Sequence, residues 1–250
     1  MAEEVVLPRF VTQAPHPLRA LLVGNSGSGK STFISQLIGN KDQVFPRPGY
    51  VKFVYCSPNL NADYASPEDS SFQQRLRRLA EPVEIVFEDH VPTYDEVLQH
   101  AEVTRGRILI FFDDFSQQLF STDLIFHLFT RLSSHQSIDS CVTLHQGLSA
   151  GKAAGRWHDL VFSNANFLVI FQNIADRQAV STMSRRIFPG GKNHLARCLA
   201  QATRIMGSYA HIIVDANLKN PLNARFGVRT NLFQERDRPL VLFKNPPDYH

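Results

Sequence analysis

One glycine-rich stretch constrains this chain more than any other. The apolar run at 20–23 leads directly into the pattern Gly-x-x-x-x-Gly-Lys-Ser, whose residues are Gly24, Asn25, Ser26, Gly27, Ser28, Gly29, Lys30, Ser31 and Thr32. Apolar residues then recur at helical spacing, at Phe33, Ile34, Leu37 and Ile38. A strand, such a loop and a helix in this order are typical of a phosphate-binding loop, so the sequence predicts a nucleoside triphosphate site.

The residue types in this loop fit the chemistry of phosphate binding. Backbone N–H groups over 25–31 must turn inward around the phosphate chain, and the three glycines of the loop allow the backbone angles and the close approach. We expect Lys30 to reach the β- and γ-phosphates and the Ser31 hydroxyl to hold Mg²⁺. A chance glycine-rich turn is the alternative, which the flanking strand and helix disfavour. ATP and Mg²⁺ are therefore the predicted ligands.

Composition limits the remaining function classes. The 250 residues, of which 43% are hydrophobic and 20% charged, suit one α/β domain. A net charge of +3 is mild, so any nucleic-acid contact must come from local patches or from a ring of subunits. The three cysteines lie far apart and predict reduced packing residues. With no signal peptide and no apolar run of membrane length, we expect a soluble intracellular protein without membrane contact.

Apolar runs alternate with helical patterns along the chain. Strands are expected at 20–23, 51–56, 83–87, 107–112, 140–144, 167–171, 209–214 and 226–232, and helices at 30–39, 72–80, 93–103, 122–133, around 157, and over about 176–187 and 193–206. This alternation predicts a mostly parallel sheet covered by helices on both faces. We divide the chain into an N-terminal arm (1–17), one ATPase domain (18–235) and a C-terminal tail (236–250).

Two adjacent carboxylates, Asp113 and Asp114, end the apolar strand at 107–112. In a phosphate-binding fold we expect this strand to lie beside the first strand, with its acidic tip facing the metal. Asp113 would hold Mg²⁺ through its water shell, and Asp114 would take a proton from the attacking water. The alternative is a solvated strand end whose aspartates cap the next helix.

Gln146 ends the next predicted strand and is the third candidate. An amide there can hydrogen-bond both the γ-phosphate and the attacking water. A polar turn residue before Gly147 is an equally good interpretation. The role of Gln146 stays open at this point.

Together these motifs resemble those of the FtsK–HerA group of RecA-like (ASCE) P-loop NTPases. The segments 167–173 and 176–178 resemble the strand–Asn–x–x–Asp–Arg motif of viral packaging ATPases, and 209–215 and 228–233 resemble closing motifs of that branch. The likeness is greatest to the genome-packaging ATPases of Polinton-like and adinto-like DNA viruses, relatives of the poxvirus packaging ATPase. It covers about residues 18–235.

This resemblance implies an ATP-hydrolysing motor that assembles as a homo-oligomeric ring, a pentamer or a hexamer. Its partners would be double-stranded DNA and a capsid or portal protein, at the site of virion assembly in the host cell, the nucleus. Such ATPases usually carry an arginine finger in the turn before the Gln-tipped strand, but residues 134–140 contain no arginine. Arg131 is the nearest substitute, and the others are Arg177, Arg185, Arg186 and Arg229.

Two basic clusters are candidates for DNA contact. Arg75, Arg77 and Arg78 form one, and Arg185 and Arg186 form the other. Either could touch phosphates if it lined a central channel, and a solvated helix face is the alternative for each.

Three other functions remain open on the sequence alone. A cellular-type DNA translocase or helicase would share the same motifs. A nucleotide kinase would need an arginine-bearing lid, for which the loop around Lys152 and Arg156 is short. A non-hydrolysing nucleotide switch would leave Asp114 and Gln146 without a role.

Overall fold

A single sheet of nine strands, in the order β3-β2-β4-β5-β1-β6-β7-β8-β9, runs through the computed structural model of the chain. Its strands are β1 (Arg19–Val23), β2 (Lys52–Cys56), β3 (Glu84–Glu88), β4 (Ile108–Phe112), β5 (Ile138–Leu144), β6 (Phe167–Phe171), β7 (His211–Asp215), β8 (Gly227–Arg229) and β9 (Leu242–Phe243). The structure describes residues 13–60, 72–104, 106–145, 158–172, 177–188, 190–216, 227–233 and 241–243.

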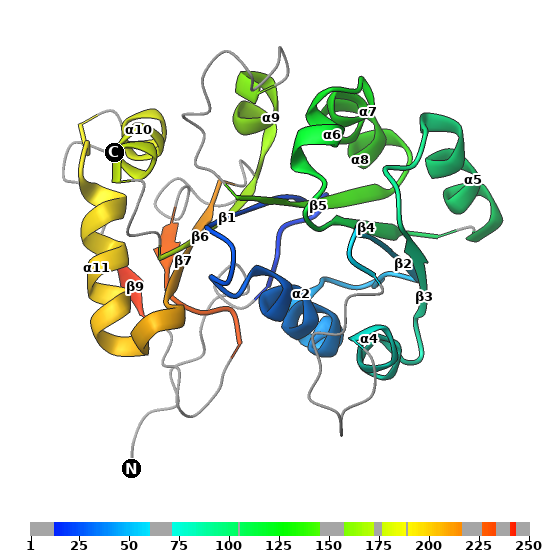
Figure 1. The fold of residues 1–250 in the computed structure, drawn as a ribbon, viewed down its shortest axis with the longest axis horizontal. Helices are drawn as coiled ribbons and strands as arrows, with labels where there is room; N and C mark the ends of the chain where they lie inside the picture. Colours follow the sequence, from blue (N-terminus) through cyan, green and yellow to red (C-terminus); the bar gives the residue numbers. More distant parts are fainter. Residues whose placement is uncertain are drawn as a thin grey trace.

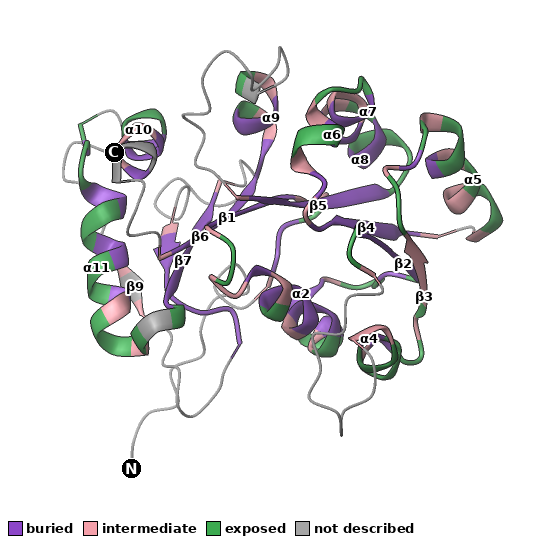
Figure 2. Ribbon diagram, viewed as in Figure 1, coloured by how far each residue is buried: buried purple, intermediate pink, exposed green. Residues whose placement is uncertain are grey.

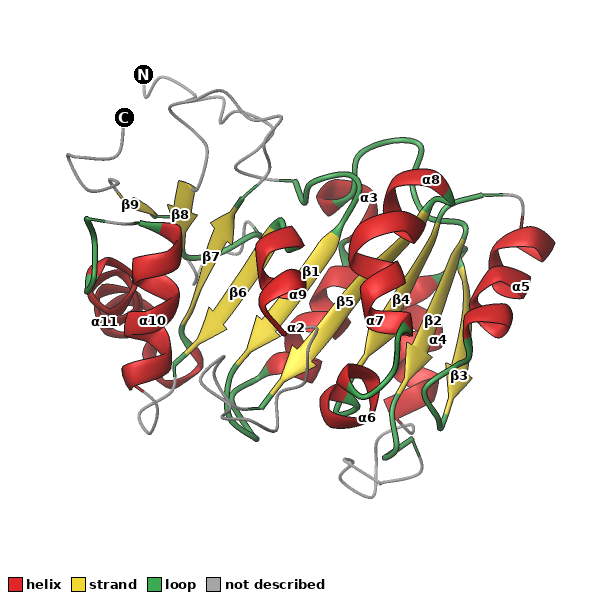
Figure 3. Ribbon diagram, turned by 90° about the horizontal axis from the view of Figure 1, so that it is seen from above, coloured by secondary structure: helices red, strands yellow, loops and turns green. Residues whose placement is uncertain are grey.

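The sheet has a parallel part and an antiparallel part (Figure 3). Strands β3, β2, β4, β5, β1 and β6 are parallel neighbours. Strands β7, β8 and β9 extend the sheet beyond β6 with antiparallel pairing. The predicted α/β class with a mostly parallel sheet is confirmed.

Helices cover both faces of the sheet, as predicted (Figure 1). One face carries α2 (Lys30–Gly39), α3 (Lys41–Val44) and α4 (Phe72–Ala80). The other carries α5 (Tyr94–Thr104), α6 (Ser116–Phe120), α7 (Leu124–His127), η1 (Leu128–Leu132), α8 (Ser133–His135), α9 (His158–Asn164), α10 (Arg177–Ile187) and α11 (His194–Met206), followed by the 3₁₀ turn η3 (Gly207–Tyr209). No helix in the described ranges has the length and apolar character needed to cross a membrane.

The apolar runs that predict the strands form the centre of the molecule. Figure 2 shows that the parallel strands between the two helix layers are mostly buried, except β3 at the edge of the sheet, which is only partly covered. Each of Ile108–Phe112 is fully buried, because alternate side chains enter the core on opposite faces. Cys56, Cys141 and Cys198 are buried and unpaired, as predicted, and burial raises the pKa of each thiol.

Local sequence signals set several helix boundaries. Thr93 and Glu96 form the expected capping box at the start of α5, with the Thr93 N–H donating to Glu96 Oε2 (2.7 Å) and the Glu96 N–H to Thr93 Oγ1 (3.3 Å). The single helix expected at 122–133 is instead interrupted by a π-helical turn at 128–132. There the Thr130 hydroxyl donates to the Phe126 carbonyl (2.6 Å), a side-chain bond that competes with regular helical pairing.

One expectation about strand neighbours is wrong. Strand β4, which ends in the two aspartates, does not lie beside β1, because β5 pairs with both and separates them. Which parallel strands become neighbours depends on how the crossover helices pack against the sheet. The residue pattern within one strand does not contain this information. The acidic strand end still reaches the loop after β1, across the end of β5.

Candidate nucleotide site at the carboxyl edge of the sheet

The candidate site lies where the parallel strands end, the usual place for ligands in α/β sheets. A cleft of about 580 Å³ opens there, a size that suits a small-molecule ligand. Its walls come from the loop after β1, from the ends of β2, β4, β5 and β6, and from α4 and η3. Residues that are distant in the sequence therefore meet at one place.

The loop after β1 has an open, inward-turned backbone. Gly27 and Gly29 adopt φ angles of 73° and 101°, which side-chain-bearing residues rarely adopt. Gly24 is needed for a different reason, since a Cβ there would lie 2.5 Å from Ser28 Oγ and 2.8 Å from Phe171 Cβ. Helix α2 begins at Lys30, so its positive dipole end points into the loop.

Lys30 is held beneath this loop. Its Nζ donates to the carbonyl oxygens of Gly24 (2.8 Å) and Asn25 (2.9 Å) and lies 3.4 Å from His145 Nδ1. Burial lowers the pKa of Lys30, while Asp113 and Asp114 act in the opposite direction. The ammonium group is thus fixed where the loop surrounds a negatively charged ligand.

Asp113 links the loop to the acidic strand end. Its Oδ2 accepts hydrogen bonds from Ser31 Oγ (2.7 Å) and from the Tyr55 hydroxyl (2.6 Å). Its Oδ1 is buried without a hydrogen-bond partner, and no cation within the described residues forms an ion pair with it. A buried carboxylate in this state is costly unless a cation joins it. Ser31 and Asp113 therefore fit Mg²⁺, a cation that prefers oxygen ligands.

Asp114 is positioned by an unusual backbone conformation. Its φ of 64° is left-handed, and its N–H donates to Thr143 Oγ1 (3.0 Å) on β5. Its half-buried carboxylate Oδ1 pairs closely with His145 Nε2. The contact of Lys30 Nζ with Nδ1 fits the His145 tautomer that has its proton on Nε2 and donates to Asp114.

Two residues of this site were not identified from the sequence. His145, at the end of β5, connects Lys30 with Asp114, and Tyr55 holds Asp113. No spacing rule marks a lone histidine or a buried strand tyrosine, although the position of His145 at a parallel strand end was a usable signal. Gln146, the predicted third element, lies outside the described residues.

The arginines separate into different environments. Arg75, expected as a DNA contact, lines the nucleotide cleft and stacks over Phe72 at 5.2 Å. Arg229 is only 2% exposed and faces Asp215, so its environment is that of a core residue. Arg131 is exposed on η1, which leads to the start of β5 at the opposite edge of the sheet, so it does not reach the cleft of its own chain. Whether it serves a neighbouring subunit stays a prediction.

The remaining arginines named above lie outside the cleft or outside the description. Arg185 and Arg186 are exposed on α10, where Arg186 NH1 pairs with Asp159 Oδ1 (2.8 Å). The side chain of Arg177 is not among those described, nor are Lys152 and Arg156.

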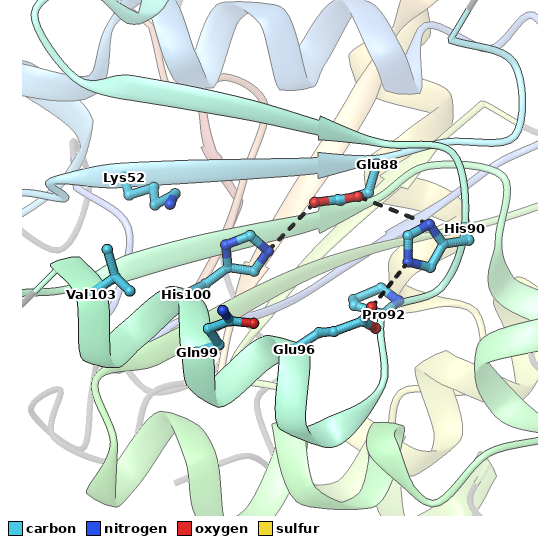
Figure 4. A pocket seen from close by; sticks show the side chains of 8 residues that line it. All are labelled: Lys52, Glu88, His90, Pro92, Glu96, Gln99, His100 and Val103. Atoms are coloured by element: carbon cyan, nitrogen blue, oxygen red, sulfur yellow. Dashed lines mark ion pairs between the residues drawn. The ribbon is translucent and has the colours of Figure 1, made fainter.

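A second hollow lies between β3 and α5 and has a different character (Figure 4). His100 and His90 point toward Glu88, and His90 also approaches Glu96, with N–O distances of 3.6–3.9 Å. Burial lowers the pKa of His100, and a hydrogen bond with Asp89 raises that of His90. Among the described residues, no group of three or more histidine, cysteine, aspartate or glutamate side chains is arranged to hold a metal ion. These histidines contact carboxylates at the end of β3 and near the start of α5.

No described protein family and no curated protein matches the sequence. Among solved structures, the chain is similar to EssC (ATPases 2 and 3) from Geobacillus thermodenitrificans, with a TM-score of 0.41 and 13% identity. The similarity covers 65% of this chain and 33% of that one, so the chain matches about a third of the length of EssC.

Proposed function

We propose that this chain is a Mg²⁺-dependent ATPase. The observation that carries the proposal is the convergence of the glycine loop, Lys30, Ser31 and two carboxylates on one cleft. The loop and Lys30 supply donors and positive charge for a triphosphate, and the carboxylates supply acceptors for a cation and a proton. A site that binds the triphosphate without hydrolysing it would need the loop and Lys30, but no carboxylate that accepts a proton.

The side chains divide the work of hydrolysis between them. Backbone N–H groups of the loop hold the β-phosphate, and Lys30 binds the β- and γ-phosphates. Ser31 and Asp113 would hold Mg²⁺, which would supply positive charge to offset the negative charge that develops on the phosphate oxygens. Asp114 accepts a proton from water as the water oxygen bonds to the γ-phosphorus, and the bond to the β,γ-bridging oxygen breaks to release ADP.

His145 acts as a positioning residue in this scheme. It donates from Nε2 to Asp114 and accepts from Lys30 at Nδ1, so one ring fixes the base relative to the phosphate-binding amine. A change in the phosphates held by Lys30 would reach Asp114 through this ring. Such a connection suits an ATPase that reports its nucleotide state.

We further infer that the ATPase is a motor that moves double-stranded DNA into a viral capsid as a ring of subunits. The support is the resemblance of residues 167–173, 209–215 and 228–233 to segments of packaging ATPases. These segments include β6, β7 and most of β8. Strand β6 pairs with the P-loop strand β1 on the side away from the aspartates, and β7 and β8 follow β6 in the sheet. Strands there can transmit movement of the P-loop to the rest of the subunit.

The test is steady-state ATP hydrolysis with and without linear double-stranded DNA, combined with light scattering on the same samples. Wild type, Lys30→Ala and Asp114→Asn are compared. Turnover that DNA stimulates in a ring-sized species, and that both variants lose, supports the motor. Turnover by a monomer that is indifferent to DNA contradicts the motor and leaves the ATPase.

Product analysis in the same experiment tests the kinase alternative. A hydrolase releases free phosphate in amounts equal to ADP. Transfer to an added nucleoside monophosphate, with no free phosphate, contradicts hydrolysis. If no nucleotide turns over or binds, the ATPase proposal itself fails.

A further inference from the structure

The two walls of the nucleotide cleft differ in chemistry. On one side of the loop lie Asp113, Asp114 and Arg75, which carry charge. On the other side lie two aromatic rings, Tyr209 from η3 and Phe171 from the end of β6. Measured from an ideal Cβ on Gly29, Tyr209 Cδ1 is 3.7 Å away and Phe171 Cε1 is 3.9 Å away. The aromatic wall therefore rests directly against the phosphate-binding loop.

The charged wall fixes which way a nucleotide must lie. Ser31 and Asp113 are the predicted ligands of Mg²⁺, which would attract the terminal phosphates, so these phosphates belong on the acidic side. The α-phosphate and the nucleoside then leave the loop on its opposite side. That direction leads to Tyr209.

Tyr209 is an unusual residue for this place. Its side chain is 62% exposed, whereas Phe171 beneath it is 2% exposed and packs edge-on against Phe33 at 5.9 Å. An exposed ring at the rim of a cleft offers an open face on which a flat aromatic group can stack. Phe171 is already enclosed by its neighbours and supports the rim.

The backbone holds Tyr209 in this position. Gly207 ends α11 with a φ of 76°, a conformation that favours glycine and turns the chain into η3. The Ala210 N–H donates to the Gly207 carbonyl (3.1 Å), and the Ala210 carbonyl accepts from Gln172 at the end of β6 (2.9 Å). The turn that carries the ring is thus tied to the strand beside the P-loop.

Phe72 is the competing platform on the acidic side. The Arg75 guanidinium covers its ring at 5.2 Å, and Tyr55 meets it edge-on at 5.7 Å. Tyr55 in turn donates to Asp113, which places Phe72 next to the predicted metal side. Its ring therefore has less open surface, and it lies where the terminal phosphates belong.

We propose that Tyr209 is the platform on which the nucleotide base stacks, so that this site takes triphosphates with an aromatic base in preference to the inorganic triphosphate chain. The inference rests on the proposed nucleotide-binding function. Stacking against an aromatic face tolerates any base, because every base has such a face. Tyr209 consequently favours nucleotides as a class without choosing among bases.

Isothermal titration with Mg·ATP and with Mg·tripolyphosphate separates the base from the phosphates. We expect Tyr209→Ala to weaken ATP binding about tenfold and to leave tripolyphosphate binding unchanged. Tyr209→Phe retains the ring and should bind both ligands as wild type does. Ile205→Ala is the matched control, since Ile205 is also exposed (45%) near the end of α11 but does not line the cleft.

Three outcomes would overturn the inference. Equal weakening of both ligands by Tyr209→Ala means that the ring supports the loop and does not bind the base. A selective loss in Phe72→Leu, with none in Tyr209→Ala, places the base on the acidic side. If the wild-type protein binds neither ligand, both the proposed nucleotide-binding function and the role of Tyr209 are wrong. If it binds tripolyphosphate but Tyr209→Ala does not weaken ATP binding, only the role of Tyr209 is wrong.

Discussion

Two tyrosines lie near opposite ends of β2, and each donates a 2.6 Å hydrogen bond to a buried aspartate. At the carboxyl edge Tyr55 holds Asp113, and at the amino edge Tyr50 holds Asp139. Arg107 completes the second pair, with NH2 3.0 Å from Asp139 Oδ2 and its guanidinium 4.5 Å from the Tyr50 ring. Within the described residues, no arginine or lysine pairs with Asp113.

This difference distinguishes a structural carboxylate from one available for binding. Arg107 NH1 also donates to the carbonyl oxygens of Pro46 (3.3 Å) and Pro48 (2.8 Å), so its guanidinium joins a loop to the sheet. Burial raises the pKa of Tyr50, and Asp139 raises it further. At the amino edge the chain itself supplies a cation, Arg107, to the tyrosine-bound Asp139. At the carboxyl edge the tyrosine-bound Asp113 has no such arginine or lysine among the described residues, so its carboxylate can accept a cation from solution.

The largest expected effect concerns catalysis at the carboxyl edge. Asp113→Asn should lower ATP turnover about 1,000-fold, since it removes charge that holds the metal and thereby stabilises the transition state. Its melting temperature should stay the same or rise, because a buried charge without a protein cation is lost. A steady-state phosphate-release assay and a thermal melt on the same preparation measure both. A large fall in melting temperature would contradict the comparison.

Stability at the amino edge should respond in the opposite way. Asp139→Asn leaves the Arg107 charge buried without its partner and should cost about 3 kcal/mol of unfolding free energy. Urea denaturation measures it. The triple variant Arg107→Met, Asp139→Leu and Tyr50→Phe should recover part of that loss, because the ion pair and the hydroxyl bonded to it are replaced by apolar side chains while the Pro46 and Pro48 carbonyls lose their donor. If the triple variant is as unstable as the single one, the ion pair is not the cause.

The two tyrosines permit a matched test of smaller size. Tyr55→Phe should weaken Mg²⁺ activation about tenfold, because the carboxylate that holds the metal loses an orienting hydrogen bond. Tyr50→Phe should leave Mg²⁺ activation unchanged and cost about 1.5 kcal/mol of unfolding free energy. Metal titration of turnover and urea denaturation of both variants distinguish the roles. Identical profiles for the two variants would remove the distinction drawn between the edges.

The smallest expected effect concerns Arg75. Arg75→Ala should weaken ATP binding by about threefold to fivefold, since a solvent-exposed cation near phosphates contributes about 1 kcal/mol or less. Arg78→Ala, on the same helix but outside the cleft, is its control. Equilibrium binding of ATP and of DNA is measured for each. A loss of DNA binding alone would restore Arg75 to the role predicted from the sequence.

The sequence predicts the secondary structure around the cleft correctly in outline. The P-loop pattern gives the strand, the loop and the start of α2, and the boundaries of α4 agree with the expected 72–80. Asp113 and Asp114 can be predicted as site residues because they directly follow a long apolar strand. These features are local, so a short window of residues contains the whole signal.

Other parts of the site are formed by residues distant in the sequence. His145 and Asp114 meet because β5 pairs with β4, and Tyr209 reaches Gly29 because β7 pairs with β6. The insertion of β5 between β1 and β4 was not expected either. The ion pair of Arg107 with Asp139 likewise joins the starts of two strands that the sequence alone does not bring together.

By itself the sequence determined the class of fold and predicted the kind of ligand, because hydrophobic periodicity and loop chemistry act over a few neighbouring residues. Only the tertiary structure decided which strands are neighbours, which aspartate is neutralised by an arginine, and which aromatic ring faces the loop. Those outcomes depend on burial and on contacts between distant segments. The free energy of such contacts is set by the packed sheet as a whole, and no single segment contains it.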